Sequence, residues 1–131
     1  MARNSKAMDA SRKDFGREAE RLARHWLIQK GMTLVVRNWR CKLGEIDLVM
    51  MDGDTLCFVE VRAKATADDG HPLETITAPK RRRLARLAEA YLALHPGHEG
   101  PLRFDAVGIV GQEGRYEVIH VPDAFAWRRE F

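Results

Sequence analysis

The chain has 131 residues, enough for one domain that buries roughly two-thirds of the surface its unfolded form would expose. Hydrophobic residues make up 45% and charged residues 31%, an ordinary balance for a globular protein, and no apolar run approaches the ~18 residues that span a bilayer. Because the N-terminus lacks an apolar signal-peptide core, we predict a cytoplasmic protein without a membrane partner, whose cysteines, Cys41 and Cys57, stay reduced.

The net charge of +3 belongs to the first 13 residues, which hold one acid, Asp9, against the bases Arg3, Lys6, Arg12 and Lys13. We predict that residues 1–13 form a basic, disordered tail and that residues 14–131 form the folded domain. The rest of the chain is electrically neutral. General basicity is therefore no argument for a nucleic-acid partner, and only local patches of charge can provide one.

The first half of the domain is predicted to be a helix followed by three strands. The helix covers residues 15–30, where one face carries Phe15, Ala19, Leu22, Ala23, Trp26 and Leu27. Gly31 then offers a stop. A short β-rich segment at 32–40 and two further strands around Asp52-Gly53-Asp54 form a meander.

The second half begins with a loop over 65–77, rich in residues that break regular structure. Pro79 then opens a second helix, whose apolar face carries Leu84, Leu87, Ala88 and Tyr91. Strands over 102–110 and 115–121 follow, and Phe125 and Trp127 lie in a short tail. The predicted order is αβββαββ, a mixed α/β single domain.

The second and third strands, "GEIDLVMMDGDTLCFVEVRAK", carry ionisable residues in segments apolar enough to be core. Buried charges are unfavourable by several kcal/mol unless they are paired or bind a metal. Alternation along a strand places Glu45 and Asp47 on one side of the second strand and Glu60 on one side of the third. Whether these sides coincide depends on the register of the hairpin.

Two registers bring the acids to one face. A type I′ turn at Asp52-Gly53 places Glu45 opposite Glu60, whereas a type II′ turn at Gly53-Asp54 places Asp47 opposite Glu60. A three-residue loop would send the acids to opposite faces. The turn residues favour a two-residue loop, and both two-residue registers stay open.

Carboxylates at cross-strand distance repel one another, and a hard divalent cation is their natural partner. Arg62 and Lys64 share the side of Glu60, where positive charge would stabilise a phosphate. This pattern predicts Mg²⁺ or Mn²⁺ bound by Asp47 and Glu60 for phosphodiester hydrolysis. The alternative for the same spacing is a ladder of ion pairs on a solvated face.

Several segments occur in the order and spacing of the bacterial YraN family: "FGREAERLA", "RNWRCKLGEIDLV", "FVEVRAK", the Lys80 that opens the second helix, and "RFDAV". The resemblance runs from about Phe15 to Phe125, and "GEID" followed by "FVEV" is specific in combination. That family is similar to the restriction-endonuclease-like, or PD-(D/E)XK, nucleases and distantly to archaeal Holliday-junction resolvases. The resemblance implies a central sheet flanked by helices, although Ile46 stands where such nucleases have a proline.

The resemblance also implies roles for individual residues. Asp47 and Glu60 become metal ligands, Arg62 their electrostatic partner, and Glu20 a third acid supplied by the first helix. Without the resemblance, Glu20 is a carboxylate at the boundary of an apolar face. Arg62 stands where nucleases generally use lysine, and its guanidinium is a poor general base because it stays charged; Lys64 is the residue available to replace it.

A basic run begins the second helix. Lys80 extends the apolar stripe backwards by one turn, so it is predicted to face the sheet at a helix N-terminus that favours anions. The alternative is a lysine that reaches out to solvent. The residues that continue the charge around the helix are Arg81, Arg82, Arg83 and Arg86. They are predicted to follow a phosphate backbone, with a solvated face as the alternative.

A second basic segment precedes Gly44 and interleaves Trp39 with Arg37, Arg40 and Lys42. This composition is typical of a platform on which unpaired bases stack, although such a tryptophan can instead cap the edge of a core. In the fourth strand, Arg103 and Asp105 share a face and are predicted to pair.

The sequence thus predicts a Mg²⁺- or Mn²⁺-dependent nuclease that acts on DNA, ahead of RNA, including branched or damaged DNA. A homodimer would suit a two-stranded substrate. The alternative is a non-catalytic nucleic-acid-binding or partner-scaffold module on the same fold, motivated by Arg62 and by the neutral core. A third interpretation is a structural domain with surface ion ladders.

Overall fold

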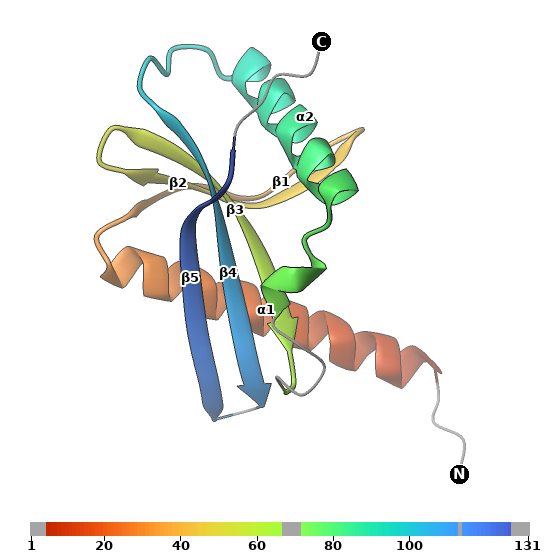
Figure 1. The fold of residues 1–131 in the computed structure, drawn as a ribbon. Helices are drawn as coiled ribbons and strands as arrows, with labels where there is room; N and C mark the ends of the chain where they lie inside the picture. Colours follow the sequence, from red (N-terminus) through yellow and green to blue (C-terminus); the bar gives the residue numbers. More distant parts are fainter. Residues whose placement is uncertain (1–4, 67–71, 113, 127–131) are drawn as a thin grey trace.

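The computed structural model of the protein describes residues 5–66, 72–112 and 114–126 (Figure 1). The elements are, in order, α1 (Ser5–Gln29), β1 (Thr33–Cys41), β2 (Gly44–Asp52), β3 (Thr55–Lys64), the 3₁₀ turn η1 (Pro72–Thr75), α2 (Ala78–Leu94), β4 (Leu102–Gln112) and β5 (Arg115–Phe125). The predicted αβββαββ order and the single α/β domain are confirmed. Within the described ranges, no helix has both the length and the apolar character that a bilayer span requires.

The five strands form one mixed sheet in the order β1-β2-β3-β4-β5. All neighbours are antiparallel except β3 and β4, which run parallel from Leu56 beside Leu102 to Lys64 beside Val110. A parallel pair needs a long crossover connection, and α2 lies within it.

The turn between β2 and β3 decides the register of the acids. Asp52 pairs with Thr55, so the loop is Gly53-Asp54, and Gly53 has the positive φ of +61° that opens a type II′ turn. The described ladder ends at Leu48 beside Val59. One residue further, the same register sets Asp47 opposite Glu60, which is the second of the two predicted registers.

Two apolar clusters cover the faces of the sheet, one under each helix (Figure 1). The α1 cluster includes Ala19, Ala23 and Leu27 against core residues of β2, β3 and β4, and the α2 cluster includes Leu84, Leu87, Ala88 and Tyr91. Both predicted apolar helix faces are therefore confirmed. Cys41 and Cys57 are free thiols, as predicted.

Some element bounds differ from the predicted ones. The first helix begins at Ser5 and not at Phe15, so residues 5–13, predicted to be a disordered tail, are helical. This segment has no glycine or proline and is rich in strong helix formers, whose backbone preference carries the helix beyond its apolar face. At the other end, β5 continues past Val121 to Phe125, because an edge strand tolerates Pro122. Trp127 of the predicted tail lies outside the described residues.

Candidate functional site

The acids gather where β2 separates from β3. Ile46 packs in the α2 cluster and Leu48 in the α1 cluster, although residues two apart on a regular strand share a face. The strand therefore twists at Asp47. The Asp47 carboxylate accepts a hydrogen bond of 2.8 Å from the backbone N–H of Val61, which lies two residues beyond Val59, the last β3 residue of the described β2–β3 ladder. This hydrogen bond holds the Asp47 side chain at the point where β2 and β3 separate.

Three elements supply the carboxylates. Ligand oxygens of Glu20 from α1 and of Glu45 and Asp47 from β2 all lie within 4.8 Å of one another. Glu60 of β3 lies within side-chain hydrogen-bonding reach of Asp47 but does not belong to that group of three. The predicted ligands Glu20 and Glu60 thus each lie beside the third, Asp47, and Glu45 joins them. We call these four residues the acid cluster.

Asn38 links two members of the acid cluster. Its side-chain amide donates hydrogen bonds to Glu20 Oε2 at 2.8 Å and to Glu45 Oε1 at 2.7 Å. The backbone of Asn38 is left-handed, with φ of 52°, a conformation that asparagine tolerates better than most residues. Arg40 adds a contact of 3.2 Å to the second Glu45 oxygen. The cluster is therefore held together by donors from β1.

Burial and mutual repulsion oppose ionisation in the cluster. Burial, followed by the charge of Glu60, raises the pKa of Asp47 to about 8, and the Val61 N–H only partly offsets this. The charges of Glu20 and Glu45 act in the same upward direction. The pKa of Glu60 is also raised, chiefly by burial, against the opposing effect of Arg62. At neutral pH, Asp47 therefore keeps a proton in the free protein.

Cations surround the inner end of the cluster. Arg62 Nε lies 3.4 Å from Glu60 Oε1, and their side chains are 27% and 16% exposed. Lys80 and Arg83 of α2 are close enough to lower the pKa of Glu60. The Nε atom of Arg62 is buried and, among the described residues, has no hydrogen-bond partner. Arg62 thus contacts Glu60, but its Nε–H donor is still available for a hydrogen bond.

A cavity of about 500 Å³ adjoins the acid cluster. It is lined by the middle of α1, the end of β3, Thr75 and the first turn of α2, which contribute Phe15, Gly16, Ala19, Glu20, Val61, Arg62, Ala63, Lys64, Thr75 and Lys80. The predicted site residues Glu20, Arg62, Lys64 and Lys80 therefore all line this one cavity. Lys80 faces the sheet end as predicted.

The predicted base-stacking platform is arranged differently. The Trp39 ring packs edge-on against Tyr91 at 5.3 Å and against His95 at 6.3 Å, as part of the α2 cluster. This is the core-edge position named as the alternative. Arg37, Arg40 and Lys42 are exposed, so their predicted contacts with nucleic acid remain available.

Sequence reasoning missed two residues of the site. Asn38 is not among the predicted site residues, and Glu45 is predicted to lie on the acidic face of the hairpin but not to act as a ligand. An asparagine inside a β-rich segment was the available signal, because asparagine disfavours strands and favours left-handed backbone.

A second polar cluster lies under α1, away from the acid cluster. Asp105 is fully buried and accepts hydrogen bonds from Arg103 at 2.7 Å, from the Asp123 N–H at 3.0 Å and from His120 at 2.8 Å. The predicted pairing of Arg103 with Asp105 is confirmed. These contacts lower the pKa of Asp105 despite its burial.

Comparison with known proteins identifies the family to which the chain belongs. The model of the uncharacterised protein family UPF0102 matches residues 19–109. The chain belongs to this family. The UPF0102 protein of Prosthecochloris aestuarii is 43% identical over 118 residues, covering 86% of this chain and 93% of the relative. The UPF0102 protein of Clavibacter michiganensis is 45% identical over 108 residues, covering 82% and 92%.

A third UPF0102 protein, from Nitrosococcus oceani, is 41% identical over 117 residues and covers 88% of this chain and 94% of its own. The matched range of the family model holds Glu20, Glu45, Asp47 and Glu60. The names of these UPF0102 relatives state no reaction, ligand or partner. The similarity to restriction-endonuclease-like nucleases therefore stays a prediction from the residues.

Proposed function

We propose that this UPF0102 protein is a divalent-cation-dependent nuclease that hydrolyses phosphodiester bonds at the acid cluster, with DNA as the favoured substrate. The observation that carries the proposal is the convergence of four carboxylates from α1, β2 and β3 beside a cavity lined by Arg62, Lys64 and Lys80. A solvated ion ladder would not bury Asp47 and Glu60 together at the expense of their ionisation.

The residues fit a hard divalent cation. Glu20, Glu45 and Asp47 offer oxygen ligands within 4.8 Å of one another, a spread compatible with metal–oxygen distances of about 2.0 to 2.4 Å around one ion. Glu60 lies beside Asp47 to complete the set. Mg²⁺ or Mn²⁺ bound there would supply polarisation of the phosphate and a more acidic water. The same charge would draw the proton from Asp47.

The neighbouring cations suit the transfer of a phosphoryl group. Arg62, held by Glu60 at the cavity wall, offers N–H donors to non-bridging phosphate oxygens as negative charge develops on them. Lys80 approaches the same place from the N-terminus of α2, where the helix dipole also favours anions. Arg62 cannot accept a proton at working pH, so its role is electrostatic.

Divalent-ion binding and cleavage test this proposal together. Mn²⁺ and Mg²⁺ are titrated by calorimetry into the wild type, Asp47→Asn and the control Asp54→Asn, which changes an exposed acid on the same hairpin. The proteins are then assayed on labelled branched, single-stranded and duplex DNA and on RNA. We expect Asp47→Asn alone to lose both ion binding and cleavage. The proposal is refuted if no substrate is cut or if cleavage survives in Asp47→Asn.

One observation favours a second candidate, a non-catalytic nucleic-acid-binding module. Arg62 stands where the nucleases that this sequence resembles generally use lysine, and its guanidinium is a poor general base. Such a module would bind nucleic acid without a divalent ion, and Asp47→Asn would leave its affinity unchanged. An Arg62→Lys variant that gains cleavage, when the wild type has none, would support this candidate.

A further inference from the structure

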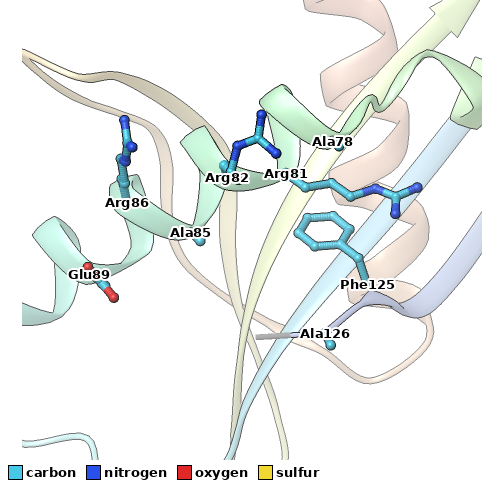
Figure 2. Close-up of a pocket in the computed structure, with 8 residues that line it drawn as sticks. All are labelled: Ala78, Arg81, Arg82, Ala85, Arg86, Glu89, Phe125 and Ala126. Atoms are coloured by element: carbon cyan, nitrogen blue, oxygen red, sulfur yellow. The ribbon is translucent and has the colours of Figure 1, made fainter. Parts of the chain in front are cut away.

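The basic run at the start of α2 divides between two sides of the helix. Lys80 and Arg83 lie close enough to act on Glu60 of the acid cluster. Arg81, Arg82 and Arg86 instead line a separate cavity of about 490 Å³, between the outer side of α2 and the end of β5 (Figure 2). The sequence predicts one charged surface at the start of this helix, whereas in the structure the basic residues of α2 face two different sites, the acid cluster and this second cavity.

Arg81 is held in place at the second cavity. Its Nε donates a 3.2 Å hydrogen bond to the carbonyl of Ile76, and its guanidinium lies over the Phe125 ring, 5.8 Å from the centroid. Phe104 stacks on the Phe125 ring, with the two ring centroids 4.7 Å apart. Because the guanidinium is already oriented, little side-chain freedom remains to be lost when an anion binds.

Arg82 and Arg86 add charge to the same cavity. They lie one turn apart on α2, about 6 Å along its axis, and extend from the same side of the helix (Figure 2). The rest of the lining is formed by the apolar residues Ala78, Ala85, Phe125 and Ala126 and by one acid, Glu89, so three cations face a single carboxylate.

We propose that this cavity, bounded by Arg81, Arg82, Arg86 and Phe125, binds one nucleotide of a single nucleic-acid strand outside the acid cluster. The guanidinium groups would contact backbone phosphates, and the apolar residues of the lining would lie against the base. The cavity volume lies within the usual range of ligand pockets. The inference rests on the nucleic-acid substrate of the proposed function, but it requires neither the metal nor hydrolysis.

Binding is measured with a fluorescein-labelled single-stranded oligodeoxynucleotide by anisotropy, in EDTA and in an Asp47→Ala background, so that metal and cleavage play no part. The test variant is Arg82→Ala/Arg86→Ala. The matched control is Arg21→Ala/Arg115→Ala, which removes the same charge from exposed positions on α1 and β5. We expect the test variant to bind roughly 20-fold more weakly at 0.1 M salt, with a salt slope smaller by about 1.4, because each lost phosphate contact removes about 0.7.

A third variant separates blockage of the cavity from loss of arginine. Ala78→Glu places a carboxylate at the exposed first residue of α2. The helix dipole interacts favourably with an acid at this end, so the substitution should not destabilise the fold. We expect it to weaken oligonucleotide binding with an unchanged urea midpoint. The inference is overturned if the Asp47→Ala background protein does not bind the oligonucleotide, or if the test and control double variants lose equal affinity. It is also overturned if Ala78→Glu binds normally. None of these outcomes depends on whether Asp47 supports cleavage.

Discussion

Asp47→Asn is expected to stabilise the metal-free protein. Burial and the charge of Glu60 raise the pKa of Asp47 from 3.8 to about 8 in the folded state. Folding at neutral pH must therefore either bury a charge or take up a proton. Asparagine has nearly the same shape and still offers an oxygen to the Val61 N–H, but it carries no charge to bury.

The magnitude follows from the two pKa values. One pKa unit corresponds to about 1.4 kcal/mol, so protonating this carboxyl at pH 7 reduces the free energy of unfolding by about 4 kcal/mol. We expect Asp47→Asn to recover about 2 to 4 kcal/mol of this, because Glu60 stays buried next to the substituted side chain.

The raised pKa of Asp47 also determines how the free energy of unfolding changes with pH. Between about pH 4 and pH 8, the folded state holds a proton on Asp47 that the unfolded state has lost, so wild-type stability declines as pH rises. The difference between Asp47→Asn and wild type should therefore widen by about 1.4 kcal/mol per pH unit in this window and become constant above it.

Urea unfolding in EDTA at pH 5, 6, 7 and 8.5 measures this difference. Asp54→Asn, an exposed acid in the turn of the same hairpin, is the control and should match the wild type throughout. A constant difference between Asp47→Asn and wild type across this range would refute the reasoning. So would a less stable Asn variant. A more stable variant that has lost its activity would also show that the lost activity is not a folding defect.

Other expectations follow from the same contacts. Ion affinity measured by calorimetry should rise up to about tenfold per pH unit below pH 8, because the ion displaces the Asp47 proton; pH-independent affinity would exclude Asp47 as a ligand. Asn38→Gly, which keeps the left-handed backbone, should lower urea stability by about 1–3 kcal/mol through the lost amide, and unchanged stability would contradict this. Asp105→Ala should lower it by about 3–5 kcal/mol because His120 and the Asp123 N–H lose their acceptor and the half-buried Arg103 keeps only Asp52, and a loss below 1 kcal/mol would contradict it. Gly111→Ala should lose at least about 2 kcal/mol, since φ is +136° and a Cβ would lie 1.9 Å from a backbone oxygen; a neutral change would show that the turn relaxes.

The hairpin shows how far local sequence rules reach. Alternation placed Asp47 and Glu60 on matching faces, and the turn residues narrowed the register to two. The Gly53-Asp54 loop then selected one of these registers. The end of the ladder at Leu48 could not be predicted, because it depends on Ile46 turning from one apolar cluster to the other.

Trp39 and Asn38 show where local rules fail. An aromatic between basic residues suits a stacking platform, yet the Trp39 ring packs against Tyr91, which arrives from α2 more than 50 residues later in the chain. Asn38 looks like an irregularity in β1 until Glu20 and Glu45 are placed beside it. Both roles depend on neighbours that are distant in sequence.

The sequence by itself determined the order of elements, the apolar face of each helix and the residues able to form an acidic site, because periodicity and turn chemistry act over short distances. The tertiary structure decided which acids converge, where β2 leaves β3, and how the basic run of α2 divides between two cavities. These features depend on the angles at which α1, α2 and the strands pack, and such angles are set by contacts between segments far apart in the chain.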